Sequence, residues 1–199
     1  LRGRKPSPLI PRPSAAPGVA AQQLGALVAA RPLRVNEVGH PTKNSVSFLL
    51  EDPGEKPISF VPGQFFTVLV NVNGVVHKRA YSACSSNRDT SRVRFVAKRV
   101  EDGIVSNYLA DNLREGDSLE LLGPSGRFTY EADSERENHL LLIGGGSGIT
   151  PLYAILLSVL EEEPQTRVTL IYGNSSEEDI IFRDELDNLA EAKEQLTLR

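Results

Sequence analysis

Between Leu33 and Phe128, β-branched and aromatic residues form short runs separated by turn signals. Runs of this length and composition are typical of β-strands. Asn73-Gly74 joins two of them, and this dipeptide is a strong hairpin signal because both positions tolerate positive φ. Such antiparallel strands, with one short helix among them, predict a small closed β-barrel. We expect the strands at Ser45–Leu50, Phe65–Val72, Val75–Cys84, Arg92–Arg99 and Ser118–Leu122, and the helix near Val105–Leu113.

The pattern changes after a charged spacer at about Glu131–Asn138. Apolar strands then alternate with helices, which predicts an α/β domain with a parallel sheet. We expect strands at His139–Ile143 and Arg167–Tyr172, helices at about Pro151–Glu162 and Phe182–Lys193, and the start of a third strand at Gln195–Leu198. The predicted domains are a barrel at residues 31–130 and the N-terminal part of an α/β domain at residues 137–199, which we expect to continue beyond Arg199.

Residues 1–30 are rich in Pro, Ala and Arg and contain no acidic residue. Their prolines oppose a continuous helix or a paired strand. We therefore expect a disordered leader, although the acid-poor composition leaves a targeting segment open as an alternative.

Composition narrows the classes of function. The net charge of −4 gives no reason to expect nucleic acid, which usually draws a basic surface. Cys84 is the single cysteine, which excludes an internal disulfide and a four-cysteine iron–sulfur cluster within this chain. The three histidines are scattered, so no metal site is predicted. No apolar run approaches the ~20 residues that span a bilayer, and we expect a cytoplasmic protein.

A glycine-rich segment, Gly144–Pro151, follows the first apolar strand of the α/β domain. Glycine lets the backbone approach a ligand closely, and a helix N-terminus offers free N–H groups to a phosphate. We expect Thr150 to cap the helix and Pro151 to take its first position. Ile149 stands where a P-loop has lysine, and the spacing does not match G-x-G-x-x-G, so we predict neither motif. A tight turn without a ligand is the alternative.

The second motif is Arg79-Ala80-Tyr81-Ser82, on the strand after the Asn-Gly hairpin. Alternation places Arg79 and Tyr81 on one face of the strand and Ser82 on the other. A guanidinium suits a phosphate, a phenol ring suits a flat heterocycle and a hydroxyl can bond a ring nitrogen. Taken alone, the motif also fits an ordinary half-buried strand.

In combination these motifs resemble the ferredoxin–NADP reductase superfamily from about residue 33 to the C-terminus. The resemblance implies an antiparallel six-stranded β-barrel as the flavin domain, followed by an incomplete α/β parallel-sheet nicotinamide domain. They resemble most its members that serve as reductase components of bacterial oxygenases, such as the phenylacetyl-CoA and ketosteroid hydroxylating systems. The matching segments, in the family's order, are Pro62-Gly63-Gln64-Phe65, Arg79–Ser86, Lys98-Arg99, Gly103–Leu109, Gly123–Phe128 and Gly144–Pro151.

The resemblance implies FAD and NADPH or NADH as cofactors, with hydride transfer from nicotinamide C4 to flavin N5 and single electrons passing on to a ferredoxin or oxygenase component. Arg79 would bind the flavin phosphate, Tyr81 would pack on the flavin ring and Ser82 would lie near N5. Tyr81, Ser82 and Thr150 are thus the candidate catalytic residues. The other candidate cofactor-binding residues are Lys98, Gly103, Val105, Ser106, Gly145, Gly146, Ser147, Gly148, Pro151 and Ser176.

Two departures from the family pattern leave questions open. Ser175 stands where many relatives have an arginine for the 2′-phosphate of NADPH, so the choice between NADPH and NADH is undecided, with Ser176 or Arg183 as substitutes. The family's Cys-Gly segment is absent, and a [2Fe–2S] cluster is expected only if a further C-terminal domain carries it. The remaining alternatives are a flavohaemoglobin-type or cytochrome b5 reductase-type module, a non-redox OB-type binding module and a nucleotide-binding regulatory protein without turnover.

Overall fold

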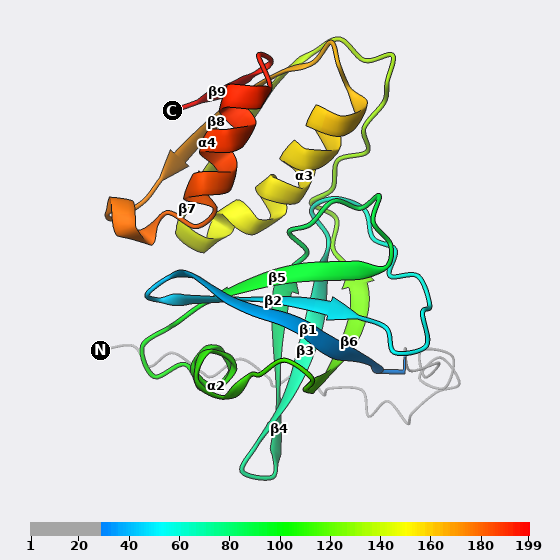
Figure 1. Cartoon of the computed structure of the whole chain (residues 1–199), viewed down its shortest axis with the longest axis vertical. Coiled ribbons are helices and arrows are strands. Elements are labelled where there is room, and N and C mark those ends of the chain that lie inside the picture. The colour runs from blue at the N-terminus through cyan, green and yellow to red at the C-terminus, as the bar shows by residue number, and fades with distance from the viewer. Residues whose placement is uncertain (1–28) are drawn as a thin grey trace, which may run out of the picture.

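The computed structural model describes residues 29–199 of the chain. The expected leader, residues 1–30, lies outside the described residues apart from its last two. The described chain forms two domains that lie side by side, a strand-rich one and a smaller one with helices packed on a sheet (Figure 1).

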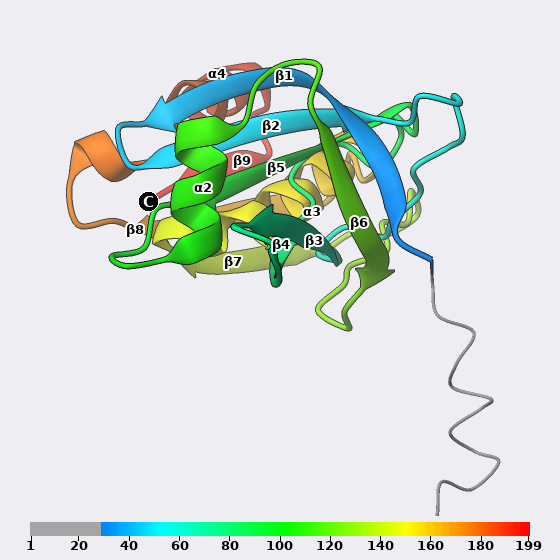
Figure 2. The same ribbon diagram turned by 90° about the horizontal axis from the view of Figure 1, so that it is seen from below.

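The first domain is a six-stranded antiparallel sheet that curls around an apolar core (Figures 1 and 2). Alternate residues of most of its strands face this core. Phe95 lies within it, with its ring centroid 5.6 Å from that of Phe48 and 5.6 Å from that of Phe66. The strand order is β4-β3-β6-β1-β2-β5, which confirms the predicted fold class. The elements are β1 Arg31–Thr42, β2 Ser45–Glu51, β3 Phe65–Val72, β4 Val75–Ser82, β5 Arg92–Lys98, α2 Ile104–Asn112 and β6 Ser118–Ser125.

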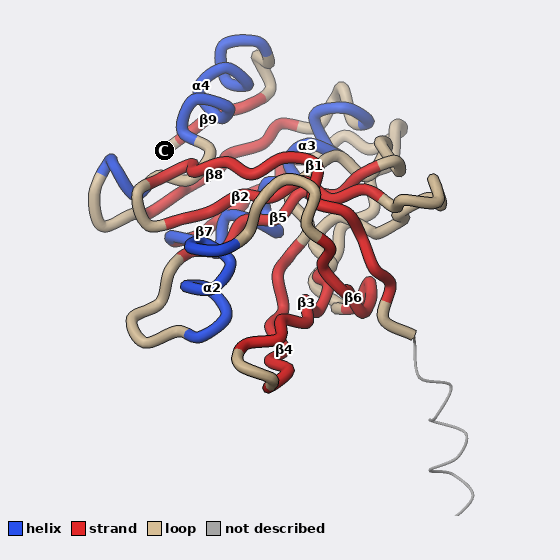
Figure 3. The backbone as a smooth tube through the Cα atoms, turned by 60° about the horizontal axis from the view of Figure 1, so that its bottom comes forward, coloured by secondary structure: helices blue, strands red, loops and turns tan. Residues whose placement is uncertain are grey.

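The hairpin between β3 and β4 has the predicted turn. Asn73 and Gly74 both have positive φ, 52° and 82°, and Val72 pairs with Val75 across the turn. The hairpin projects from the barrel (Figures 1 and 3) and exposes Val75 and Val76 at its tip.

The sequence pattern did not single out β1 as a strand. Pro32, Gly39 and Pro41 interrupt its apolar positions, and its pairing with β2 shifts register twice, between Val35 and Glu37 and between Gly39 and Thr42. Irregularities of this kind break the alternation by which a strand is recognised. Leu33 and Val35 nevertheless point into the barrel core.

The two edge strands, β4 and β5, meet only at one end. There Cys84, just after β4, donates its backbone N–H to Arg94 O of β5 at 2.9 Å. Further along, α2 lies beside the separated strands (Figure 2) and inserts Val105 and Leu109 into the barrel core. This leaves a seam between β4 and β5, with α2 at its far end.

The second domain is a parallel sheet in the order β7-β8-β9, with α3 and α4 on one face (Figure 1). Leu142, Leu170 and Leu196 pack under these helices, whereas Leu141, Ile143 and Ile171 are exposed on the other face. Among the described helices, none is long and apolar enough to cross a membrane. The elements are β7 His139–Gly145, η1 Gly146–Gly148, α3 Ile149–Glu162, β8 Arg167–Gly173, η2 Glu177–Asp179, α4 Arg183–Ala192 and β9 Leu196–Leu198.

The predicted start of α3 was wrong by two residues. The helix begins at Ile149 with Gly148 as its cap, because the 3-10 turn of η1 leads directly into it. Pro151 is the third helical residue, where its missing N–H still costs no hydrogen bond. Thr150 is therefore inside the helix, and its hydroxyl donates to Ser147 O at 3.1 Å.

A buried carboxylate ties the connector between the domains to the end of α3. Glu163 is fully buried and accepts hydrogen bonds from Tyr130 Oη (3.0 Å), Asp133 N (3.0 Å) and Arg136 Nη1 (2.9 Å). Buried charges persist only when they are paired and hydrogen-bonded. Glu163 therefore holds the connector in one conformation relative to the second domain.

Candidate functional site

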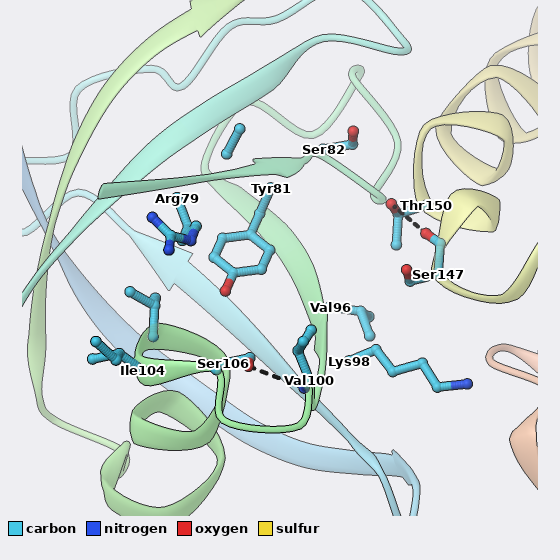
Figure 4. Close-up of a pocket in the computed structure, with 13 residues that line it drawn as sticks. Arg79, Tyr81, Ser82, Val96, Lys98, Val100, Ile104, Ser106, Ser147 and Thr150 are labelled. Carbon is cyan, nitrogen blue, oxygen red and sulfur yellow. Dashed lines mark hydrogen bonds between the residues drawn. The ribbon is translucent and has the colours of Figure 1, made fainter. Parts of the chain in front are cut away.

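A pocket of about 360 Å³ opens at the seam of the barrel, where β4, β5 and α2 face the start of α3 (Figure 4). Its volume is within the range of small-molecule sites, roughly 300–1,000 Å³. Arg79 and Lys98 give it two cations, and no carboxylate is among the described residues that line it. The lining residues are Arg79, Ala80, Tyr81, Ser82, Val96, Lys98, Val100, Gly103, Ile104, Val105, Ser106, Ser147 and Thr150.

The β4 wall carries the Arg79–Ser82 motif. Arg79 and Tyr81 point into the pocket from the same side of the strand (Figure 4), as alternation predicts. The Tyr81 ring packs edge-on against Phe48 of the core, with centroids 6.2 Å apart. Burial raises the pKa of Tyr81 to about 12, against the opposing charge of Arg79. At neutral pH its hydroxyl is therefore protonated and can donate a hydrogen bond.

The far wall is the N-terminus of α2. No side chain caps this end, and its first turn contains no acidic residue. The first helical N–H with an acceptor inside the helix is that of Asn107, which donates to Gly103 O at 3.3 Å. The N–H groups of Ile104, Val105 and Ser106 precede it, at the positive end of the helix dipole. This wall is suited to bind an anion.

Gly103 and Ser106 also shape the turn before α2. Gly103 donates its own N–H to Val100 O at 2.9 Å, and Ser106 Oγ accepts from Val100 N at 3.2 Å (Figure 4). A Cβ on Gly103 would approach Ser106 Oγ at 2.6 Å. The turn thus requires glycine for close packing, and the hydroxyl of Ser106 keeps a proton to donate.

The wall from the second domain is the turn between β7 and α3. Ser147 and Thr150 face the barrel across the pocket (Figure 4). Tyr172 of β8 holds the turn by donating to Gly146 O at 3.0 Å. Within the described chain, nothing lies within 4 Å of a Cβ built on Gly146 or Gly148. The turn therefore presents open backbone at the carboxyl end of the sheet, which is where α/β sheets bind ligands.

Lys98 connects the pocket with the second domain. Its Nζ lies 3.6 Å from Asp179 Oδ1, at the end of η2. Lys43 likewise pairs with Glu178 at 2.9 Å. In both pairs the barrel supplies the cation and the turn after β8 supplies the acid.

Most of the predicted site residues come together in this pocket, but not all of them. Ser176 lies outside it, exposed at the start of η2, where its Oγ donates to Asp179 Oδ2 at 3.3 Å. Gly145, Gly146 and Gly148 belong to the same turn as Ser147, and Pro151 lies in the first turn of α3, but none of these four residues lines the pocket. Ala80, Val96, Val100 and Ile104 line the pocket and were not predicted. Val96 lies two residues before Lys98 on the same face of its strand, so the alternation of side chains along the strand would have indicated it. Ile104 is the first residue of α2, between the predicted residues Gly103 and Val105, so its position would have indicated it.

Two family models match this chain over most of its length. Residues 32–130 match the model described as "Oxidoreductase FAD-binding domain", and residues 142–199 match "Oxidoreductase NAD-binding domain". The chain belongs to this family of FAD- and NAD-binding oxidoreductases. This confirms the resemblance inferred from the Arg79–Ser82 and Gly144–Pro151 motifs.

Individual relatives include several kinds of reductase. The chain is 38% identical over 149 residues to the ferredoxin reductase component of 3-ketosteroid-9-alpha-monooxygenase from Rhodococcus rhodochrous, covering 74% of this chain and 41% of that protein. It is 35% identical over 155 residues to NADH-cytochrome b5 reductase 2 from Lodderomyces elongisporus, covering 77% and 50%. The chain thus spans half or less of the length of these curated relatives.

Solved structures agree with this assignment. The flavohem-like FAD/NAD-binding domain of nitric oxide dioxygenase from Vibrio cholerae superposes with a TM-score of 0.77 at 28% identity, covering 85% of this chain and 72% of that one. Proteins similar to this chain therefore include the ferredoxin reductase component of an oxygenase, a cytochrome b5 reductase and a flavohem-like FAD/NAD-binding domain.

The residues present fit the flavin nucleotide that the family implies. A flavin nucleotide combines a flat apolar ring with phosphates. The pocket offers the Tyr81 ring and Val96 beside Arg79 and the uncapped start of α2. Cations and free N–H groups beside an apolar wall match both parts of such a ligand.

Proposed function

We propose that this chain works as the reductase part of an electron-transfer system, taking a hydride from NADH or NADPH and passing single electrons to an acceptor protein. The main observation behind the proposal is that three segments line one pocket: the Arg79–Ser82 strand, the start of α2 and the turn before α3. Bound FAD supplies the ring that accepts two electrons and releases them one at a time.

On the flavin side, Arg79 binds phosphate and Tyr81 packs on the ring. The guanidinium of Arg79 has no carboxylate partner among the described residues and donates only to Lys78 O at 2.8 Å, which supports its assignment to an external anion. Ser82, at the end of β4, is the hydroxyl near the reacting edge of the ring. The N–H groups of Val105 and Ser106 hold the pyrophosphate. Lys98 lines the same pocket, and its ion pair with Asp179 places its charge toward the nicotinamide side.

On the nicotinamide side, the turn Gly145–Gly148 and Thr150 receive the nucleotide. Thr150 is buried and lies across the pocket from the β4 wall, so a nicotinamide beside it faces the flavin wall. Ser176, beyond β8, is assigned to the ribose end of the nucleotide. With both cofactors bound as assigned, this placement would bring the nicotinamide to the flavin wall, and hydride transfer between them would need no acid or base from the protein.

The acceptor is a ferredoxin-like or oxygenase component. The similarity to the ferredoxin reductase component of a ketosteroid monooxygenase supports this choice. We place the protein in the cytoplasm, where NADH and NADPH are available as reductants. A cytochrome b5-type acceptor is the second candidate, supported by the similarity to NADH-cytochrome b5 reductase 2.

An absorption spectrum of the purified protein with FAD tests the proposal. We expect flavin bands that bleach when NADH or NADPH is added without oxygen. Arg79→Ala should weaken flavin affinity by roughly tenfold or more, the value of a lost charge-assisted hydrogen bond. Lys78→Ala is the matched control, since Lys78 is a neighbouring cation outside the pocket. Protein that binds no flavin, or equal affinities in the two variants, would contradict the assignment.

A further inference from the structure

Arg94 of β5 contacts three residues of the second domain. Its Cζ lies 4.8 Å from the ring centroid of Phe182 and 5.5 Å from that of Tyr153. These two rings stack on each other, with centroids 4.3 Å apart and planes at 22°. Its Nη1 also lies 3.4 Å from Glu185 Oε1 of α4. A guanidinium that stacks on rings and pairs with a carboxylate makes two kinds of contact that lysine reproduces only in part.

The barrel holds the backbone of Arg94 on both sides. Its N–H donates to Ser85 Oγ at 3.2 Å. Its carbonyl accepts from Cys84 N at 2.9 Å and from Cys84 Sγ at 3.2 Å. These bonds close the barrel directly after the Arg79–Ser82 motif. The side chain therefore extends from a fixed point of the barrel and contacts the second domain.

Arg94 lies between the two walls that the proposed hydride transfer requires. On β5, Lys98 is four residues further on the same face of the strand and lines the pocket. On α3, Tyr153 is one turn after Thr150, which lines the opposite wall. A shift of Tyr153 against Arg94 would therefore move Thr150 relative to the barrel.

The stack includes a residue with unfavourable backbone geometry. Phe182 has φ 65° and ψ 25°, in the left-handed region that bulky residues avoid. Its side chain is only 1% exposed. Strained residues persist where surrounding contacts determine their position. Here the surrounding contacts include the Tyr153 ring and the Arg94 guanidinium, within the apolar core of the second domain.

We propose that Arg94 is a positioning residue, which fixes the turn before α3 against the flavin wall by clamping Tyr153 and Phe182 to β5. The inference rests on the proposed function and concerns the placement of the two cofactor walls. Arg94 itself does not line the flavin pocket.

Three variants test this role. Arg94→Met keeps the length and apolar stem but removes the cation, and Arg94→Lys keeps the charge without the planar group. Arg92→Met is the matched control, because Arg92 lies on the same face of β5 but pairs within the barrel, with Asp89 at 2.7 Å.

The first measurement is amide hydrogen exchange of the flavin-free chain. In Arg94→Met we expect exchange in α4 and in α3 around Tyr153 to rise by roughly tenfold, as loss of a desolvated cation–π contact implies. Arg94→Lys should show a smaller rise and Arg92→Met none. Exchange in α4 that is identical in Arg94→Met and the unmodified chain would overturn the inference.

The second measurement is flavin reduction by excess NADH or NADPH without oxygen, in a rapid-mixing experiment. In Arg94→Met the limiting rate should fall by roughly ten- to a hundredfold, as misplacement by about 1 Å implies. Flavin affinity should stay within about twofold, and Arg94→Lys should restore part of the rate. An unchanged rate, or a loss of flavin affinity in parallel, would overturn the inference. If the unmodified chain binds FAD but is not reduced, the proposed function fails and hydrogen exchange alone decides the role of Arg94.

Discussion

Gly63 offers a sharp test of how the two domains are joined. It belongs to the Pro62-Gly63-Gln64-Phe65 motif, has φ +96° and lies outside the pocket. A Cβ built on it would overlap the backbone carbonyl of Phe128 and reach Ile155 of α3 at 3.4 Å. Tyr130 N also donates to Pro62 O at 3.2 Å, at the same crossing of two segments. The motif thus forms a joint between the barrel, the connector and α3.

Gly63→Ala should therefore destabilise the protein strongly. The left-handed backbone costs about 1–2 kcal/mol for a residue with a Cβ. Relief of the overlap requires the two segments to separate, which breaks the Tyr130–Pro62 hydrogen bond at a further cost of about 1 kcal/mol. The total loss of unfolding free energy is about 2–3 kcal/mol, a large part of a typical unfolding free energy of about 5–15 kcal/mol.

Gly74→Ala provides the matched control. Gly74 also has positive φ, +82°, but nothing in the described chain lies within 4 Å of its Cβ position. It should lose only the backbone contribution, about 1–2 kcal/mol. Urea unfolding of both variants at the same FAD concentration measures the difference, which we expect to be about 1 kcal/mol, the value of the broken hydrogen bond. Equal losses in the two variants would refute the reasoning that the crossing with Phe128 requires glycine.

Three further outcomes are expected. The free energy of unfolding should fall as pH rises from about 10 to 12. The unfolded chain releases the Tyr81 proton near pH 10, whereas the folded protein keeps it up to a pKa of about 12. Thermal melts over this pH range should show a smaller fall in Tyr81→Phe than in the unmodified chain. Glu163→Gln should lower the free energy of unfolding, measured with urea, by roughly 3 kcal/mol, because it leaves Arg136 without its buried ion-pair partner. The same substitution at the exposed Glu161 is the control and should lower it little. Ser106→Ala should lower flavin affinity severalfold in a fluorescence titration, because Val100 N loses its acceptor; an unchanged affinity would contradict this.

Much of the barrel follows from local pattern. Phe65–Val72 was predicted with its observed bounds, because β3 alternates regularly and ends at a turn that needs Asn-Gly. β1 was not predicted as a strand, because its prolines and register shifts interrupt the alternation of apolar and polar residues. The start of α3 was misplaced because Thr150 and Pro151 suit a helix start, whereas the 3-10 turn of η1 already supplies the first hydrogen bonds.

The residues of the site were predicted from motifs rather than from periodicity. Arg79 and Tyr81 were predicted as site residues because their motif stands in order with those at Gly103 and Gly144, and both line the pocket. Arg94 could not be identified in this way, since a single arginine on a strand has no pattern of its own. Its partners, Tyr153 and Phe182, are distant in sequence, and only the packing of α3 and α4 brings them to β5. Contacts between domains are therefore the part that one sequence does not reveal.

Strand β5 makes contacts on both of its faces from Val93 to Lys98. Val93, Phe95 and Ala97 point into the barrel core, while Arg94, Val96 and Lys98 meet the second domain. On β4, by contrast, Lys78 is exposed and outside the pocket. A saturation scan of substitutions should therefore show intolerance at every position from Val93 to Lys98, without the two-residue rhythm of an ordinary barrel strand. This strand is where changes in one domain constrain the sequence of the other.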